Sequence, residues 1–491
     1  MATLKQQTIT SIGWSTVGSL GKQSIQFVIS VILARLLLPE DFGLLGMVVV
    51  FTGFATLFND LGFGAALIQK KTLEEQHLSS VFWLNLGVGF FLTLLFMALA
   101  PLIASFYKEP QIVPLTRIVS IIFFVGAFGI VQKNLFSRKM QFKVLAAIDL
   151  LAVSIAGIIA IALAFAGYGV WSLIAQLVSF TILSVLLLWL RSNWHPRFII
   201  KRRALKELWP FSSNLLGAQL LNYGVRNVDY LLIGRYVGSA GLGIYTRAYT
   251  TMLLPINQVT AVVGRVMFPA LSRIQDDISK VKQVYLHANR MIALVTIPLM
   301  LGLLVVARPF VLTLYGPKWA AVIPVLQILC LVGIKQPLGT TVGWIYQSQG
   351  RTDLMFRWSI LSFVVTIISF FIGIRWGIIG VATAYAIGNY LIWYPAIAIP
   401  GKLIDMTFGE FIMNIAGVFG CAVGMAFITW GLGEILPKEW PIWLVLILQV
   451  IAGSVVYFVL IHVFKIQAYR EFKSLALEQW HRRRILFAAK D

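Results

Sequence analysis

The segment Gly18–Gly46 reads GSLGKQSIQFVISVILARLLLPEDFGLLG, and its polar pattern returns 200 residues later in QLLNYGVRNVDYLLIGRYVGSAGLGIY, Gln219–Tyr245. Residues three or four positions apart share one face of an α-helix, so each copy places a polar face on an apolar helix. A repeat of this length in an apolar chain predicts two homologous membrane lobes whose polar faces line a shared cavity, as in a transporter. The polar positions are Ser19, Lys22, Gln26 and Arg35 in the first copy and Gln219, Asn222, Arg226 and Arg235 in the second, followed by the aligned glycines Gly43 and Gly243.

The composition defines the broad class. Apolar residues make up 59% of the 491 residues and charged residues 12%, about half the charge of a soluble domain. Apolar runs of about 20 residues, each long enough to span a bilayer, recur from end to end. We therefore predict an all-α integral membrane protein with about 14 transmembrane helices. The first apolar run is interrupted by Lys22 and followed at once by another span, unlike a cleaved signal peptide.

Basic residues predict the orientation. With the N-terminus inside, most of the 40 Lys and Arg fall in cytoplasmic segments, above all in 133–143, 191–206 and the C-terminal tail. This bias favours both termini in the cytoplasm. Topology and attraction to anionic membrane lipids account for the net charge of +21, so the charge does not indicate nucleic acid as a partner.

The most basic loop, residues 191–207, separates the first six predicted spans from the spans that follow, so each part has an even number of spans. Both parts would therefore enter the membrane in the same direction, related by a pseudo-two-fold axis along the membrane normal. The predicted organisation is a six-helix lobe at 1–190, a basic cytoplasmic linker at 191–207, a second six-helix lobe at 208–400, two additional transmembrane helices at 401–465 and a basic cytoplasmic tail at 466–491.

Depth separates the charged residues inside the spans. An ionisable group at mid-membrane costs about 2.5–3.5 kcal/mol on insertion scales, so it needs a reason. Five charged residues lie near span ends, where snorkelling is cheap: Arg117, Asp149, Arg247, Arg265 and Arg290. Five lie deeper, and these are the candidate functional groups: Lys22, Asp60, Arg226, Asp229 and Lys335.

The deep cations suggest an anion site. Lys22, Arg226 and Lys335 come from three different helices and could converge on one anion such as a diphosphate. We predict that these three bind substrate together with the polar residues of the same faces, Gln26, Gln219 and Asn222.

The two deep acids have two interpretations each. Asp229 stands three residues after Arg226, which indicates either an internal ion pair or a group that tunes a cavity-facing arginine. Asp60 precedes Gly62 and Gly64, which permit a break in the helix. It would either form a structural hydrogen bond at that break or load and unload a proton or cation, and we predict both acids as ion-coupling residues.

Several kinds of chemistry find no support in the sequence. Gly18–Gln23 lacks the glycine spacing and the Ser or Thr of a phosphate loop, so no ATP site is visible. The five histidines have no ligand spacing, and no cofactor or metal is predicted. Cys330 and Cys421 both fall within spans and are read as small apolar fillers.

Five segments carry a family resemblance: LARLLLPEDFG (Leu33–Gly43), DLGFGAALIQK (Asp60–Lys70), FPALSRIQDD (Phe268–Asp277), GPKW (Gly316–Trp319) and IPVLQ (Ile323–Gln327). They resemble the bacterial polysaccharide transporter family, with exporters of the colanic acid and teichuronic acid type, within the multidrug/oligosaccharidyl-lipid/polysaccharide flippase superfamily. The resemblance covers about twelve spans and leaves the last two helices outside.

The resemblance implies a function and partners. Such a protein would flip a polyprenyl-diphosphate-linked oligosaccharide across the bacterial plasma membrane by alternating access, for cell-surface polysaccharide biosynthesis. It would use a coupling proton or sodium ion and work beside a polysaccharide polymerase and chain-length partners. Two alternatives remain: a cation-coupled multidrug exporter, which would favour acids in the cavity, and a membrane glycosyltransferase or polymerase, which should show a long external loop or a metal-binding acidic pair.

Overall fold

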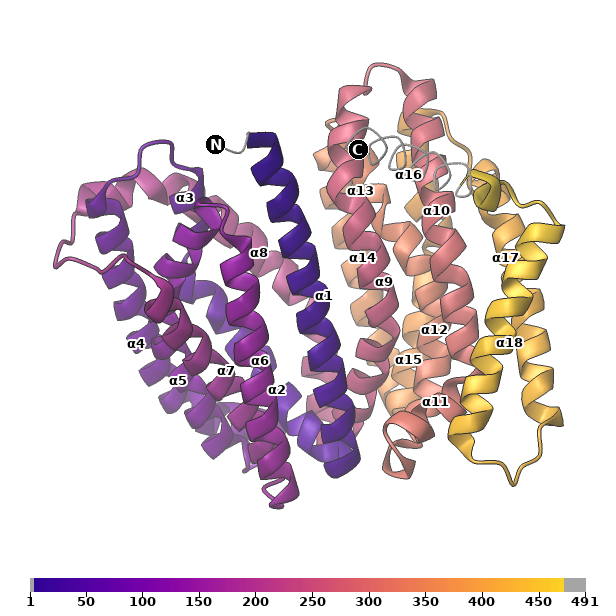
Figure 1. Ribbon diagram of the computed structural model, residues 1–491, viewed down its shortest axis with the longest axis horizontal. Coiled ribbons are helices and arrows are strands. Elements are labelled where there is room, and N and C mark those ends of the chain that lie inside the picture. Colours follow the sequence, from indigo (N-terminus) through magenta and orange to yellow (C-terminus); the bar gives the residue numbers. More distant parts are fainter. Residues whose placement is uncertain (1–3, 472–491) are drawn as a thin grey trace, which may run out of the picture. The chain divides into compact units, whose positions relative to one another are not determined.

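The structure is a computed structural model that describes residues 4–471, apart from the side chains of residues 4–12 and of scattered positions in the eighth and ninth helices. Those positions include Asn222, Arg226 and Arg265. The described residues form α-helices, short 3-10 turns and brief connections, without a β-strand among them (Figure 1). The chain divides into two compact units, Met1–Thr246 and Arg247–Asp491, which are described separately below.

The first unit is a helical bundle in which α1 packs on α6, α4 on α5, and α6 on α7. Its helices are α1 (Leu4–Leu36), α2 (Pro39–Asp60), α3 (Phe63–Gln69), α4 (Glu75–Tyr107), α5 (Ile112–Arg138), α6 (Phe142–Phe165), α7 (Val170–Arg191), α8 (Arg202–Tyr236) and the start of α9 (Ser239–Arg273).

The boundaries of α2 and α3 follow from local chemistry. Pro39 occupies the first turn of α2, where its missing N–H costs nothing, and the Asp41 carboxylate accepts from the Leu38 N–H at 2.9 Å. Leu61 and Gly62 have φ values of 51° and 78°, which ends α2 before α3 begins. The predicted break at this glycine is confirmed.

Arg138, in the last turn of α5, fixes the other end of α3. Its guanidinium donates to the backbone carbonyl of Leu67 at 2.6 Å and to that of Lys70 at 2.7 Å, with further bonds to Ile68 and Lys71. These carbonyls belong to the end of α3 and the turn after it, where helical partners are missing. A residue of the basic 133–143 segment therefore stabilises the fold directly.

The second unit contains the rest of α9 and the helices that follow it. They are α10 (Ile278–Val305), α11 (Ala307–Leu314), η1 (Pro317–Trp319), α12 (Val322–Thr340), α13 (Val342–Ser348), α14 (Thr352–Gly373), η2 (Ile374–Trp376), α15 (Gly377–Leu391), α16 (Trp393–Gly401), η3 (Lys402–Ile404), α17 (Phe408–Ile435) and α18 (Ile442–Val463). Here α10 packs on α12 and α17, and α17 on α18.

Eleven helical segments of the described residues are long and apolar enough to cross a membrane. The difference from the predicted 14 has two sources. The stretch Thr352–Ile404 counts as one segment although it contains η2 and two further helices, and α8 and α9 are absent from the eleven. The mean hydropathy of α8 is low because it carries the polar stripe, so the count of 14 stays a prediction.

The compact units divide after Thr246, not within the predicted linker. The α8 helix packs on α2, where the Tyr223 hydroxyl donates to the Val50 carbonyl at 2.8 Å. The predicted linker is hydrogen-bonded to α4. The Lys201 backbone N–H donates to Ser80 Oγ at 2.8 Å, and the Trp194 indole N–H donates to the Glu75 carboxylate at 3.0 Å. The lobes predicted from the repeat are not the same as these units and stay a prediction.

Candidate functional site

The polar face of α1 contains a partly open ion pair. Lys22 Nζ lies 3.2 Å from Asp149 Oδ2 on α6 and 4.7 Å from the centre of the Phe180 ring on α7. The two charged side chains keep 27% and 38% of their surface accessible. Pairing lowers the cost of placing both charges in an apolar bundle, while the remaining exposure leaves the ammonium reachable.

This pair corrects the interpretation of Asp149 as a snorkelling residue at a span end. Two other residues grouped with it, Arg290 and Arg247, also have protein partners. The Arg290 guanidinium donates to Asn414 Oδ1 and to Glu471 Oε1, each at 2.6 Å. Arg247 is buried, with its guanidinium 5.1 Å from the Tyr315 ring centre and 5.3 Å from that of Trp319. Distance to a span end was a poor guide because it ignores partners on other helices.

Other polar residues of the repeat are exposed on their helices. Ser19 and Gln26 on α1 are exposed, and so is Gln219 on α8. An amide left without hydrogen bonds in hydrocarbon costs several kcal/mol, on the order of 4–8 for full transfer, so these faces fit a water-filled space better than lipid. Asn222 and Arg226 lie outside the described side chains, as does the predicted pairing of Arg226 with Asp229.

Asp229 is buried in α8, with 7% of its surface accessible. Its carboxylate accepts from the backbone N–H of Tyr230 at 2.9 Å, and the Tyr245 side chain of α9 approaches it. The carboxylate thus has described partners in addition to whatever Arg226 provides.

Asp60 closes the break between α2 and α3. Its Oδ1 accepts from the Gly64 N–H at 2.8 Å, and Lys133 on α5 is near enough to act on its charge. The structural interpretation, a hydrogen bond at the break, is present in the structure. A buried carboxylate exchanges a proton most readily when no cation is near it, so the nearby Lys133 weakens the case for proton exchange at Asp60.

Lys335 lies in α12 in the second unit and has 7% of its surface accessible. Its ammonium donates to the backbone carbonyl of Asn389 on α15 and lies 5.5 Å from the centre of the Tyr390 ring. Lys22 and Lys335 therefore each have partners within their own compact unit, and their predicted convergence on one anion stays a prediction.

Three buried side-chain amides were not predicted as candidate functional groups, because only charged residues inside the spans were selected by depth. Asn59, Asn85 and Gln132 on α2, α4 and α5 are at most 5% accessible. Asn59 Nδ2 donates to the Phe123 carbonyl at 2.9 Å, whereas both side-chain polar atoms of Asn85 and of Gln132 have no partner within the described structure. An amide inside an apolar span was the available signal, because such groups need partners or water.

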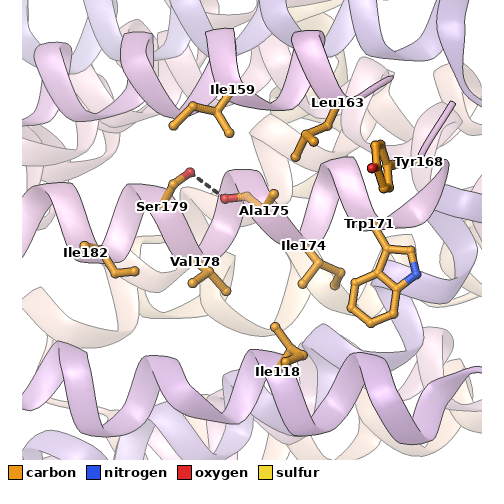
Figure 2. Close-up of a pocket in the computed structure, with 10 residues that line it drawn as sticks. All are labelled: Ile118, Ile159, Leu163, Tyr168, Trp171, Ile174, Ala175, Val178, Ser179 and Ile182. Atoms are coloured by element: carbon orange, nitrogen blue, oxygen red, sulfur yellow. Dashed lines mark hydrogen bonds between the residues drawn. The ribbon is translucent and has the colours of Figure 1, made fainter. Parts of the chain in front are cut away.

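A pocket of about 540 Å³ on α5, α6 and α7 does not suit a polar ligand (Figure 2). Its walls are mainly aliphatic, and the Ser179 hydroxyl already donates to the Ala175 carbonyl at 2.5 Å. Tyr168 and Trp171 gather at one end of it. Such a surface fits hydrocarbon rather than sugar or phosphate.

Within the described residues, no group of three or more His, Cys, Asp or Glu side chains is placed to hold a metal ion. Long apolar helices with a partly open charge pair on the first of them define a multi-pass membrane protein of the transporter type. Residues 32–324 match the model of a family described as polysaccharide biosynthesis protein. The chain belongs to this family.

Relatives extend the match to nearly the whole chain. The teichuronic acid biosynthesis protein TuaB of Bacillus subtilis is 30% identical over 491 residues, covering 98% of this chain and 99% of TuaB. The lipopolysaccharide biosynthesis protein WzxC of Escherichia coli is 26% identical, with 89% of each chain covered. The succinoglycan biosynthesis transport protein ExoT of Rhizobium meliloti is 29% identical, with 74% of each covered.

Solved structures show the same fold. The lipid II flippase MurJ in its inward closed conformation gives a TM-score of 0.71 at 18% identity, covering 93% of this chain and 99% of MurJ. An inward-facing multidrug resistance MATE transporter of the MOP superfamily gives 0.56 at 18% identity, covering 81% and 95%. At this identity the likeness concerns the fold alone, which is that of the MOP superfamily.

Proposed function

We propose that this protein is a flippase that moves oligosaccharide repeat units linked to polyprenyl diphosphate across the plasma membrane for cell-surface polysaccharide biosynthesis. The observation that carries the proposal is the partly open, positively charged face of α1 at Lys22, in a chain that matches TuaB over its whole length. Sugars and diphosphate need a wet, cationic path, while a polyprenyl tail can stay in lipid. The protein acts as a transporter and not as an enzyme.

The Lys22–Asp149 pair supports a substrate role for Lys22. An ammonium held by one carboxylate at 3.2 Å, with part of its surface open, can exchange that partner for a phosphate oxygen. In the empty protein Asp149 prevents an unpaired charge, and in the loaded protein the diphosphate takes its place. Gln26, one turn further along α1, is exposed and offers donors and acceptors to sugar hydroxyls.

The activity is tested in two ways. Deleting the gene should make lipid-linked repeat units accumulate on the cytoplasmic side, and the purified protein in proteoliposomes should expose labelled lipid-linked oligosaccharide to an external enzyme or lectin. Absence of both effects, with a well-folded protein, would refute the flippase assignment.

The substrate residues are tested one by one. Lys22→Gln should reduce flipping at least about tenfold, since a charge-assisted hydrogen bond contributes about 1.5–3 kcal/mol, while Lys22→Arg keeps part of the activity. We extend the same expectation to Arg226→Gln and Lys335→Gln, with protein amount and membrane insertion nearly normal. If the loss of flipping follows the loss of protein for every variant, these residues are structural.

The remaining parts of the proposal concern coupling and orientation. Asp60 and Asp229 are proposed to load a proton or sodium ion, and alternating access is proposed to come from rocking of the two lobes. Both termini are proposed to be cytoplasmic, with a polysaccharide polymerase and a chain-length protein as partners. External cysteine labelling should reach positions in 308–318 and 434–440, and labelling at position 202 in intact cells would reverse the orientation.

A further inference from the structure

A second polar position of the repeat, Arg235, lies beside Phe106, which lines an apolar groove in the first unit. The groove has a volume of about 620 Å³ and runs along α4 between α2 and α8. Phe51 of α2 and Leu231 of α8 line it, together with the α4 residues Phe96, Leu99, Leu102, Ile103, Ser105 and Phe106. Leu231 and Arg235 stand four residues apart on α8, so they share one helix face.

Arg235 is positioned by contacts that belong to the groove. Its guanidinium carbon lies 5.8 Å from the ring centre of Phe106, a wall residue that itself packs edge-on against Phe51 at 6.0 Å. The preceding residue, Gly234, lets α8 approach Tyr107 closely, because a Cβ there would lie 2.6 Å from the Tyr107 ring. The charge is therefore placed at the groove by backbone and ring packing.

The position in the chain sets the chemistry of the occupant. Arg235 lies in the last turn of α8, at the boundary of the apolar stretch, and its neighbour Tyr236 is exposed, as is usual at a membrane interface. Apart from Ser105, the groove walls are aliphatic and aromatic, and Leu102 keeps 67% of its surface accessible. A cation at the interface above a hydrocarbon groove is complementary to a lipid with an anionic headgroup.

We propose that this Arg235 groove is a binding site for an anionic phospholipid, with the phosphate on Arg235 and one acyl chain along Phe51, Leu102 and Phe106. A lipid-facing helix surface without such a groove holds exchanging lipids and selects no headgroup. Here the Arg235 guanidinium beside the groove adds a charge-assisted hydrogen bond to the lipid phosphate. This interaction favours an anionic lipid, because the phosphate of a zwitterionic lipid is already partly neutralised by its own ammonium group. A phospholipid fits better than the sugar-bearing substrate, because Ser105 is the one polar residue in the described lining of the groove and sugars need many polar partners.

The test uses the full-length protein in detergent, with lipid binding read by native mass spectrometry and by thermal stabilisation. Phosphatidylglycerol should be retained in preference to phosphatidylcholine, and Arg235→Gln should weaken its binding about tenfold or more. Arg235→Lys should keep part of the affinity. Leu231→Trp, which fills the groove and keeps the charge, should also displace the lipid, so a folding defect in one variant does not decide the result. Lys438→Gln removes an exposed charge of the α17–α18 connection and should have no effect.

Four results would overturn the proposal. Equal retention of the two phospholipids, or unchanged binding in Arg235→Gln, would remove the headgroup interaction. Displacement of phosphatidylglycerol by millimolar inorganic phosphate would indicate a free phosphate site. Tighter, Arg235-dependent binding of polyprenyl monophosphate would assign the groove to the substrate carrier instead of a phospholipid. None of these results depends on whether the protein flips oligosaccharides.

Discussion

The start of α2 and the polar face of α1 belong to the same repeated segment, yet they are built in opposite ways. At the α2–α9 crossing, a Cβ on Gly43 would lie 1.7 Å from the Ser239 carbonyl oxygen, and one on Gly243 would lie 1.9 Å from that of Pro39. The two backbones touch, and the contact has no room for a side chain. On α1, by contrast, Ser19 and Gln26 are exposed.

The difference separates what the family shares from what a substrate meets. The family match begins at residue 32, so it includes Gly43 and Gly243 and leaves out Ser19, Lys22 and Gln26 of α1. The family match therefore includes a backbone packing contact, while Lys22, a proposed substrate residue, lies outside the match. The glycines should control whether the protein folds, and Lys22 should control what it transports.

The largest effect is expected at the crossing. In Gly43→Ala and Gly243→Ala, the added methyl group clashes with a backbone carbonyl oxygen of the other helix. A backbone carbonyl cannot rotate away as a side chain would. Overpacking of this kind costs about 1–3 kcal/mol or more, against a gain of at most about 1 kcal/mol from replacing a helical glycine. We expect less folded protein and a lower melting temperature, measured by fluorescence-detected size exclusion after heating.

Gly87→Ala is the matched control for the crossing. Gly87 lies within α4, and a Cβ there meets no atom within 4 Å. This variant should be neutral or slightly stabilised, by up to about 1 kcal/mol. If Gly43→Ala were as stable as Gly87→Ala, the crossing would not be a backbone contact, and the contrast with α1 would fail.

The next effect concerns Asp60, which belongs to a family segment but carries a charge. An asparagine at this position keeps the oxygen that accepts from Gly64 and loses only the charge. Asp60→Asn should therefore leave stability nearly unchanged and abolish the response of flipping to an imposed pH or sodium gradient. Flipping and substrate binding are measured separately in proteoliposomes.

Asp229→Asn is the comparison for that experiment. Asparagine keeps the oxygen that accepts from Tyr230 but removes the predicted ionic partner of Arg226, so stability or substrate affinity should fall, and not the gradient response alone. A full gradient response in Asp60→Asn would instead make Asp60 a packing residue like Gly43, with its bond to Gly64 as its role.

The sequence predicted most of what depends on neighbours along the chain. Helix positions follow from apolar runs, and the break after Asp60 follows from Gly62. The partner of Lys22 could not be predicted, because Asp149 is 127 residues away and nothing in its local sequence selects it. The partners of Lys335 could not be predicted either, since they are a backbone carbonyl and an aromatic ring on α15. Side-chain partners across helices depend on packing that a single sequence does not encode locally.

A smaller effect is expected at Arg138. This residue of the basic 133–143 segment stabilises the fold, as Gly43 does, and is not proposed to contact substrate. Arg138→Gln removes the guanidinium donors to the end of α3 and should destabilise the protein by about 1.5–3 kcal/mol at most. Lys139→Gln, the exposed neighbour, removes the same charge and should change little. Melting temperatures of the two variants test this, and equal values would show that only the charge of this segment matters.

The smallest effect is expected at Glu207, in the first turns of α8 before its apolar stretch. Its carboxylate lies 2.7 Å from Lys70 Nζ, 3.3 Å from His77 Nε2 and 3.5 Å from Arg203 Nε. Hydrogen bonds from Lys70 and then from His77 lower the pKa of Glu207 from 4.5 to about 2. Since the pKa is lower in the folded protein, the cluster stabilises it fully above pH 4.5, and this contribution is lost as the pH falls towards 2.

Glu207→Gln should therefore melt slightly below the wild type at neutral pH, and the difference should shrink between pH 4.5 and 2. The effect is small because water screens exposed ion pairs. Glu439→Gln, in the exposed α17–α18 connection, serves as the control and should follow the wild type throughout. A constant difference between wild type and Glu207→Gln across this range would mean that Glu207 contributes through packing and not through its charge. Glu207 would then stabilise the fold through packing, as Gly43 does, and electrostatic attraction would not contribute to the contact between α3 and α8.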